Sequence, residues 1–142
     1  MPDPEHQQRA VETVKDLLGT PYKTGGSDSE GTDCSGLTNQ AYPDYFPKRE
    51  TAAGQLEYLK KKGDEDVPAK DLKPGDLVYF KDKNVNITHT AIVEKVDASA
   101  DHPVSIIAAS SNPKKHMVVR QKLRKNGNLG DGLMYAGGGR PR

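Results

Sequence analysis

Two kinds of hydrophobic pattern divide this chain, and their order limits the folds that it can adopt. Three segments in the first half have the apolar spacing and end signals of helices: 4–18, 34–41 and 51–62. Five later segments have the pattern of strands: about 76–81, 89–97, 104–110, 116–123 and 133–136. Helices followed by strands predict an α+β fold, with N-terminal helices packed on a roughly five-stranded antiparallel sheet.

Turn-forming residues support these boundaries. Thr51 is predicted to cap the third helix, and Gly63 to follow its last residue. In "LKPGDLVYF", Pro74 and Gly75 fit the two central positions of a type II turn that leads into the first strand.

The length of the chain bounds the number of domains. A chain of 142 residues suits one modest hydrophobic core, so we predict a single domain over 1–142. The last residues, "GGGRPR", predict a flexible tail over 137–142.

Charge and composition argue against several classes of partner. A formal net charge of +1 gives no long-range field for nucleic acid, and no apolar stretch is long enough for insertion into a membrane. The single cysteine argues against a disulfide framework and a cysteine-rich zinc site, and the four histidines are scattered. We therefore expect no metal and no cofactor.

The N-terminal stretch "MPDPEHQQRA" is acidic and polar, which is not the composition of a signal peptide. Three expectations follow and stay open. The chain is cytoplasmic, or is secreted or delivered to the bacterial periplasm without a cleaved signal peptide, or is part of a longer protein.

The single cysteine, Cys34, lies at the predicted start of the second helix, within "GTDCSGL". Helix N-terminal amides stabilise a negative charge there, which predicts a lowered thiol pKa and a nucleophilic thiolate. Asp33 or Thr32 can cap the same turn, and Gly36 is expected to leave room for a substrate. The competing interpretation, a small buried hydrophobic cysteine, is equally compatible with this position.

A nucleophilic cysteine needs a base, and histidine is the usual one. His89 opens the strand pattern "HTAIVEKV", from which an imidazole can reach a helix start packed on the sheet. His6 falls on the polar face of the first helix and is expected to be solvated. Spacing alone favours a strand-end histidine without a catalytic role for His89.

Three sequence blocks together carry a family resemblance. "LLGTPYKTGG" with "GTDCSGLTNQAY", then "LKPGDLVYF", then "ITHTAIVEKV" resemble the NlpC-type cell-wall peptidases, a papain-like family, over roughly residues 10–110. The D-C-S-G tetrapeptide alone would be a weak signal, but three blocks in the family's order form a specific one.

The resemblance implies a papain-like cysteine peptidase that cuts the peptide stems of peptidoglycan, often between D-glutamate and the diamino acid. Carried over residue by residue, Cys34 is the nucleophile and His89 is the general base and acid. Tyr22, Asp33 and Ser35 fall on positions that line the substrate cleft. Tyr22 is equally compatible with a core aromatic, and Asp33 with a simple helix cap.

The chain departs from the family pattern at several positions. Thr24 stands where an aromatic residue is common, and Ala91 replaces a usual glycine. Ala108 stands where a histidine normally orients the catalytic imidazole. Arg49 resembles the family's Pro-Arg-Thr segment and is expected to be structural.

The third catalytic residue therefore stays open. A hairpin flanked by Val96 and Val104 would put His89 opposite about residue 111. Five polar residues are candidates for the orienting role: Ser110, Ser111, Asn112, His102 and His116.

Three functions are compatible with these observations. The first is a peptidoglycan endopeptidase or amidase. Such an enzyme could be delivered as an antibacterial effector, and an inhibitor or immunity protein would then be a possible partner. The second is amide or acyl-transfer chemistry on another substrate with the same dyad. The third is a catalytically weak or inactive binding module, which Ala108 favours and the intact Cys34 and His89 oppose.

Overall fold

The computed structural model describes residues 4–28, 30–46, 49–64, 67–110, 116–129 and 132–141. Its helices are α1 (Pro4–Asp16), α2 (Cys34–Ala41), α3 (Ala52–Lys62) and the short 3-10 helix η1 (Ala69–Asp71). Its strands are β1 (Ser27–Asp28), β2 (Gly31–Thr32), β3 (Leu77–Lys81), β4 (Ile87–Val96), β5 (Val104–Ala109), β6 (Val118–Leu123) and β7 (Met134–Gly139).

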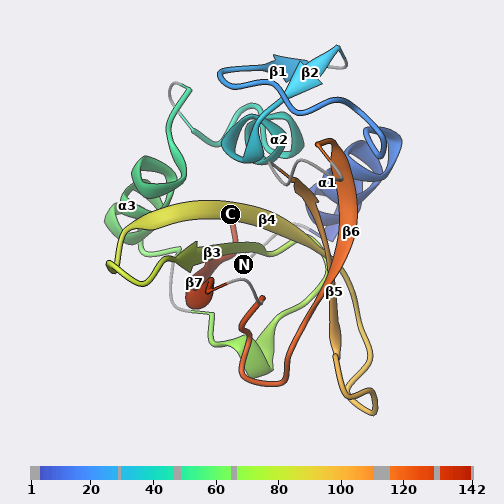
Figure 1. The fold of residues 1–142 in the computed structure, drawn as a ribbon, viewed down its shortest axis with the longest axis vertical. Helices are drawn as coiled ribbons and strands as arrows, with labels where there is room; N and C mark the ends of the chain where they lie inside the picture. The colour runs from blue at the N-terminus through green and yellow to red at the C-terminus, as the bar shows by residue number, and fades with distance from the viewer. Residues whose placement is uncertain are drawn as a thin grey trace.

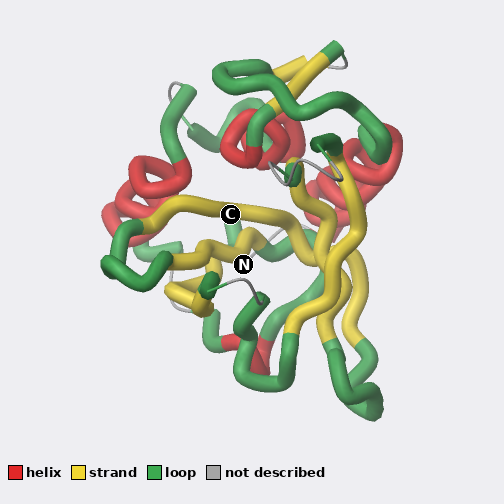
Figure 2. Tube along the Cα trace, viewed as in Figure 1, coloured by secondary structure: helices red, strands yellow, loops and turns green. Residues whose placement is uncertain are grey.

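Five of the strands form one antiparallel sheet in the order β6-β5-β4-β3-β7. The helices α1, α2 and α3 lie together on one side of this sheet, and the small β1–β2 hairpin lies beyond α2 (Figures 1 and 2). The predicted α+β fold, with helices packed on a five-stranded antiparallel sheet, is confirmed. The β1–β2 hairpin and η1 were not predicted, because two- and three-residue elements carry no hydrophobic period.

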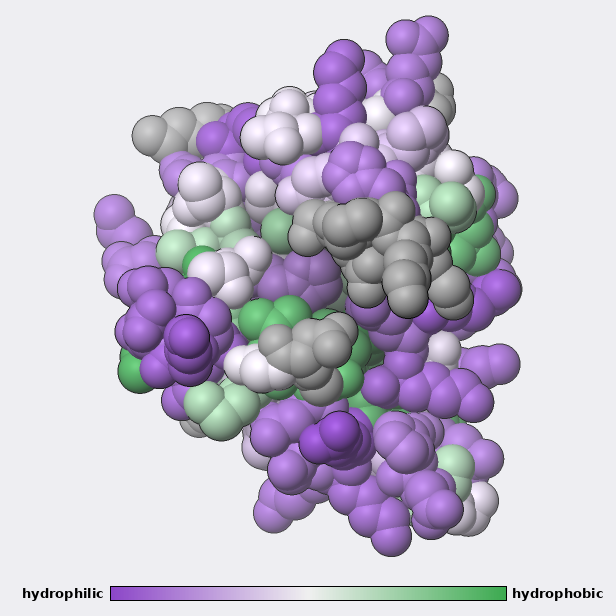
Figure 3. All heavy atoms as spheres, viewed as in Figure 1, coloured by the Kyte–Doolittle hydropathy of each residue, from purple (hydrophilic) through white to green (hydrophobic). Residues whose placement is uncertain are grey.

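Both faces of the sheet are covered, and each face has its own hydrophobic cluster. On the helix side, Leu77, Tyr79 and Ile92 pack with apolar side chains of the three helices. On the other side, Val78 and Phe80 pack with side chains from the segments around η1 and before β7. Because both faces are buried, β3 and β5 read as continuous apolar runs rather than as alternating ones. On the face shown in Figure 3, most of the coloured surface is polar.

The caps of α3 form as predicted. The Thr51 hydroxyl accepts a hydrogen bond from the Gly54 amide at 3.1 Å. Gly63 ends the helix at φ 77°, in the left-handed region where glycine carries no steric penalty. These local signals therefore fix α3 between the residues that the sequence indicates.

The expected flexible tail over 137–142 is wrong for residues 137–141. Residues 137–139 complete β7, where Gly139 pairs with Leu77 and Gly138 with Val78. Arg140 then forms a bidentate ion pair with the buried Asp76, with two N–O distances of 2.7 Å. A Cβ on Gly139 would lie 2.5 Å from Leu59 Cδ1, so a glycine is required where α3 packs against β7.

The register of the β4–β5 hairpin also differs by one residue from the prediction. Val96 pairs with Val104 as expected, but an irregularity between Val93 and Lys95 shifts the pairing. Beyond it, Ile92 pairs with Ile107, where the ladder ends, so the predicted pairing of His89 with a residue near 111 is not formed.

Candidate functional site at the start of α2

The start of α2 presents the single cysteine. Cys34 is the first residue of the helix, and Asp33 is its N-cap in an extended conformation. The Asp33 carboxylate accepts a hydrogen bond from the Gly36 amide at 2.7 Å, so one of the unpaired first-turn donors is satisfied. The predicted helix start is therefore confirmed, and the cap is Asp33 rather than Thr32.

Three backbone amides point at the Cys34 sulfur. Those of Cys34, Ser35 and Thr90 each lower the thiol pKa, but burial outweighs them and the pKa is raised above its ordinary value. The predicted lowering of the pKa is thus wrong for this structure. The residue as a whole is only partly buried, unlike a cysteine in the middle of a core.

The position of β4 explains how Thr90 reaches the sulfur. The pairing between β4 and β5 begins at Ile92, so the first half of β4 has no β5 partner. The N-terminus of α2 packs where the two strands diverge, and the Thr90 amide donates to Cys34 instead of to a neighbouring strand. The Thr90 hydroxyl donates to the Val78 carbonyl at 2.9 Å, which ties this part of β4 to β3.

The His89 side chain points elsewhere. His89 pairs with Phe80 across β3 and β4, and the two ring centroids are 5.8 Å apart. Because paired residues share a face, the imidazole lies on the Phe80 side of the sheet, away from the helices. Burial alone lowers the pKa of His89 to about 4.

The structure therefore joins Cys34 to the peptide of His89 and Thr90 but leaves the two functional side chains apart. Within the described ranges, no hydrogen bond links the thiol and the imidazole. Neither group shifts the pKa of the other. A raised thiol pKa and a lowered imidazole pKa mean that both groups are neutral near pH 7. The predicted charged couple is not formed in this structure, and the catalytic role of the pair stays a prediction.

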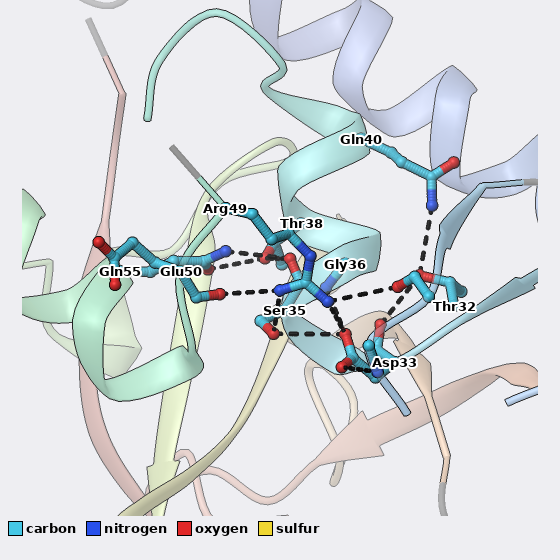
Figure 4. A network of polar contacts seen from close by, with 11 residues as sticks. Thr32, Asp33, Ser35, Gly36, Thr38, Gln40, Arg49, Glu50 and Gln55 are labelled. Carbon is cyan, nitrogen blue, oxygen red and sulfur yellow. Dashed lines mark hydrogen bonds and ion pairs between the residues drawn. The ribbon is translucent and has the colours of Figure 1, made fainter. Parts of the chain in front are cut away.

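A polar network around Arg49 holds the first turn of α2 (Figure 4). The Arg49 guanidinium donates to the Asp33 carboxylate at 2.5 Å, to the Ser35 hydroxyl at 2.8 Å and to the Gly26 carbonyl at 3.3 Å. It thereby connects the segment before α3 to the glycine-rich loop and to the helix that carries Cys34. These contacts support the structural role that was expected for Arg49.

The space beside Gly36 is filled by the chain itself. A Cβ at this position would lie 2.0 Å from the Gly26 carbonyl oxygen and 2.7 Å from Thr32 Oγ1. The expectation that Gly36 leaves room for a substrate is therefore wrong. The glycine instead allows the loop before α2 to pack directly on its first turn.

A second network lies beneath the helix, and no sequence motif predicted it. The buried Gln55 of α3 donates to the Ser35 carbonyl at 3.0 Å and accepts from the hydroxyls of Thr38 at 2.7 Å and Tyr79 at 3.1 Å. Its one signal in the sequence is a glutamine on the apolar face of α3, beside Leu56 and Leu59. A buried polar side chain of this kind needs partners, so the face of α3 and the start of α2 are held in one arrangement.

The three predicted cleft residues lie close to Cys34 but differ in exposure. Tyr22 is partly buried, and its pKa is raised by burial and by the neighbouring Cys34 and Asp33. Asp33 serves as the helix cap described above. Ser35 is 5% exposed, and its hydroxyl is engaged by Asp33 and Arg49, so its side chain lies within the network and not on an open surface. Contact of these residues with a substrate stays a prediction.

The candidates for the third catalytic residue lie in different parts of the structure. His102 is exposed in the turn beyond Val96, about 23 Å along β4 from His89 at roughly 3.3 Å per residue, which is too far to orient its imidazole. His116 stacks beside Tyr22 with ring centroids 5.0 Å apart, on the Cys34 side of the site. Ser110 is buried at the end of β5 and donates its amide to the Met117 carbonyl, beyond the last pair of β4 and β5. Ser111 and Asn112 lie outside the described residues.

Neither a metal site nor a membrane span is found in the described ranges. They contain no group of three metal-ligating side chains, and none of their helices has the length and apolar character needed to cross a bilayer.

Comparisons with known proteins agree with this geometry. Residues 19–126 match the NlpC/P60 family. The chain is 35% identical over 89 residues to a probable endopeptidase of Haemophilus influenzae, covering 61% of this chain and 52% of that protein. It is 36% identical over 91 residues to the gamma-DL-glutamyl hydrolase of Bacillus subtilis, covering 58% and 20%. Over 74 residues it is 35% identical to the murein DD-endopeptidase MepH of Escherichia coli, covering 51% and 27%.

A solved structure extends the likeness to almost the whole chain. NlpC2 from Trichomonas vaginalis superposes with a TM-score of 0.75 at 27% identity, covering 99% of this chain and 48% of that one. The chain spans from a fifth to about half of the length of the curated relatives.

Proposed function

The chain belongs to the NlpC/P60 family, and on that premise we propose that it hydrolyses amide bonds in the peptide stems of peptidoglycan, with Cys34 as the nucleophile and His89 as the general base and acid. The observation that carries this proposal is the convergence of three backbone amides on the only thiol, at the start of a capped helix. Such amides stabilise negative charge, first on the sulfur and then on an oxyanion beside it.

The mechanism starts from a neutral pair. When the scissile carbonyl approaches, the thiol proton passes to His89 Nδ1 or Nε2 as the sulfur attacks the carbonyl carbon. Because the imidazole lies on the Phe80 side of the sheet, this step requires the backbone at the start of β4 to rearrange so that His89 faces Cys34 in the substrate complex. His89 then protonates the leaving amine, and water releases the acyl group from the sulfur.

The bond that we favour is the one between D-glutamate and the diamino acid. The relatives offer two chemistries by name, a gamma-DL-glutamyl hydrolase and a murein DD-endopeptidase. Mass spectrometry of purified wall fragments after digestion distinguishes them, because the two cuts release fragments of different mass. Fragments cut at neither bond would contradict the proposal.

A second candidate is a weak or inactive binding module. Ala108 in place of an orienting histidine, together with the turned-away His89 imidazole, favours it. Binding of stem peptides without turnover, unchanged by Cys34→Ala, would establish this function in place of hydrolysis. The same dyad acting on a non-wall amide or thioester remains the other enzymatic alternative.

A more specific proposal is that the protein is an antibacterial effector delivered to the bacterial periplasm. Its partner would then be an inhibitor or immunity protein. Its support is limited to the family's wall chemistry. Expression of the chain with an added periplasmic signal should lyse cells, whereas cytoplasmic expression should not. Harm from the cytoplasm alone would point to a substrate outside the wall.

A further inference from the structure

A groove at the far end of α2 from Cys34 has no part in the chemistry described above. It has a volume of about 400 Å³ and lies between α1, the residues that follow α2, and α3. Cys34 begins α2 and Ala41 ends it, so the groove lies about 10 Å along the helix from the nucleophile, at 1.5 Å per residue. It is therefore a separate site, of the size of a small-ligand pocket.

The groove has an excess of positive charge. Arg9 reaches it from α1 and Lys62 from the end of α3, whereas Asp44 is the one acidic residue in its lining. Among the described residues, no ion pair or hydrogen bond is formed by Arg9 or Lys62, so no described carboxylate pairs with either charge. Two cations that line one groove, one from α1 and one from α3, are suited to an anionic ligand in it.

The walls between these cations are aromatic. Tyr45 and Tyr58 line the groove and pack edge to face, with ring centroids 5.4 Å apart. The Tyr45 hydroxyl donates to the Asp64 carboxylate at 2.6 Å, which fixes this ring. Rigid rings beside cationic side chains provide an apolar surface for a carbon skeleton that carries a negative charge.

We propose that this groove binds a carboxylate-bearing unit of the cell-wall polymer, with Arg9 and Lys62 on the carboxylate and Tyr45 and Tyr58 on the carbon skeleton. The choice of ligand rests on the proposed function, because peptidoglycan carries free carboxylates on its peptide stems and on those lactyl groups from which the stem has been removed. The groove would hold a neighbouring part of the polymer while Cys34 acts on a stem. It would therefore increase retention on the insoluble wall without taking part in the chemistry.

The test is a titration of the Cys34→Ala protein, which removes turnover from the measurement. Amide NMR shifts are followed with N-acetylmuramic acid in one arm and γ-D-glutamyl-alanine in the other. N-acetylglucosamine, which lacks the lactyl carboxylate, serves as the neutral control for the first arm. We expect shifts in α1 and α3 with at least one acidic probe, with a Kd of about 1 mM, and at least fivefold weaker binding of the neutral sugar.

Charge removal provides the matched variants. Arg9→Gln with Lys62→Gln should weaken binding of the acidic probe at least fivefold, whereas Lys122→Gln, on the exposed face of β6, should leave it unchanged. Absence of shifts with both acidic probes, or equal affinity in the double variant, would overturn the proposal.

A second readout separates this proposal from the proposed function. With Cys34 intact, the Arg9→Gln, Lys62→Gln protein should retain its rate on a soluble stem peptide and lose at least threefold on insoluble sacculi. Equal rates of the parent and the double variant on sacculi would contradict the wall-retention role. If neither protein cuts any stem peptide, hydrolysis fails as the function, and the probe titrations still decide whether the groove binds the ligand.

Discussion

The Thr90 amide on β4 donates to the sulfur of Cys34 at the start of α2, so the thiol lies against the peptide that follows His89. This contact connects two parts of the chain that are far apart in sequence. It also satisfies a strand amide at the point where β5 has diverged from β4. The sulfur therefore lies beside the first half of β4, whereas the His89 side chain packs on Phe80 and does not contact it.

The resting thiol should react slowly with alkylating reagents. Because burial raises the pKa of Cys34, its thiolate fraction at pH 7 is smaller than that of an ordinary cysteine, whose pKa is about 8.5. Alkylation should be slower at pH 7 than for the same chain in denaturant, and its rate should keep rising above pH 8.5. Since Cys34 is the only cysteine, the unfolded chain is a direct control. A rate that reaches its plateau below pH 7 would show a preformed thiolate and contradict this prediction.

Acid should destabilise the fold through His89. Its pKa is lowered to about 4 in the folded chain, against about 6.5 when unfolded, so the unfolded state binds more protons between these values. The free energy of unfolding should therefore decrease as the pH falls from about 6.5 to about 4, and His89→Gln should make this part of the pH profile flatter. Urea unfolding at a series of pH values measures the slope. The matched control is His102→Gln in the exposed turn, which should leave the profile unchanged.

Loss of Gln55 should weaken both stability and activity. Gln55→Leu removes three buried hydrogen bonds, those with the Ser35 carbonyl and with the Thr38 and Tyr79 hydroxyls, at a cost of about 2 kcal/mol in the free energy of unfolding. Because Ser35 directly follows Cys34, the proposed nucleophile, we also expect a decrease in kcat. Chemical denaturation and rates on a stem peptide check the two effects. Gln8→Leu, on the exposed side of α1, should change neither, and equal behaviour of the two variants would argue against the network.

The C-terminal segment should contribute to stability. Arg140→Met leaves the fully buried Asp76 carboxylate without its ion pair, at a cost of about 3 kcal/mol in the free energy of unfolding. Arg124→Met, in the exposed turn after β6, is the matched change and should cost less than about 0.5 kcal/mol. Thermal or urea unfolding compares them. Similar values for the two variants would restore the interpretation of this segment as a flexible tail.

The elements with strong local signals could be predicted from the sequence. The three helices start and end within two residues of the expected positions, because Thr51 and Gly63 and the apolar spacing act locally. The strand segments were found for the same reason. The tail over 137–142 was misjudged because "GGGRPR" has the composition of a loop, whereas its pairing with β3 and the ion pair of Arg140 depend on residues more than 50 positions away.

The site could be predicted only at the level of its backbone. The resemblance located Cys34 at a helix start and His89 on a neighbouring strand, and the structure places their main chains together. The resemblance could not give the side-chain direction of His89, because a shift of one residue in strand register decides which face of the sheet an imidazole occupies. The thiol pKa was predicted with the wrong sign because the helix amides are visible in a sequence and the depth of burial is not.

The most direct test of the central claim is the mass spectrum of peptidoglycan stem fragments after digestion by the parent protein, Cys34→Ala and His89→Ala, with His102→Ala as the control. We predict new fragments cut between D-glutamate and the diamino acid with the parent and the control, and at least 100-fold less of them with either dyad variant. Full activity in Cys34→Ala or in His89→Ala would contradict the account.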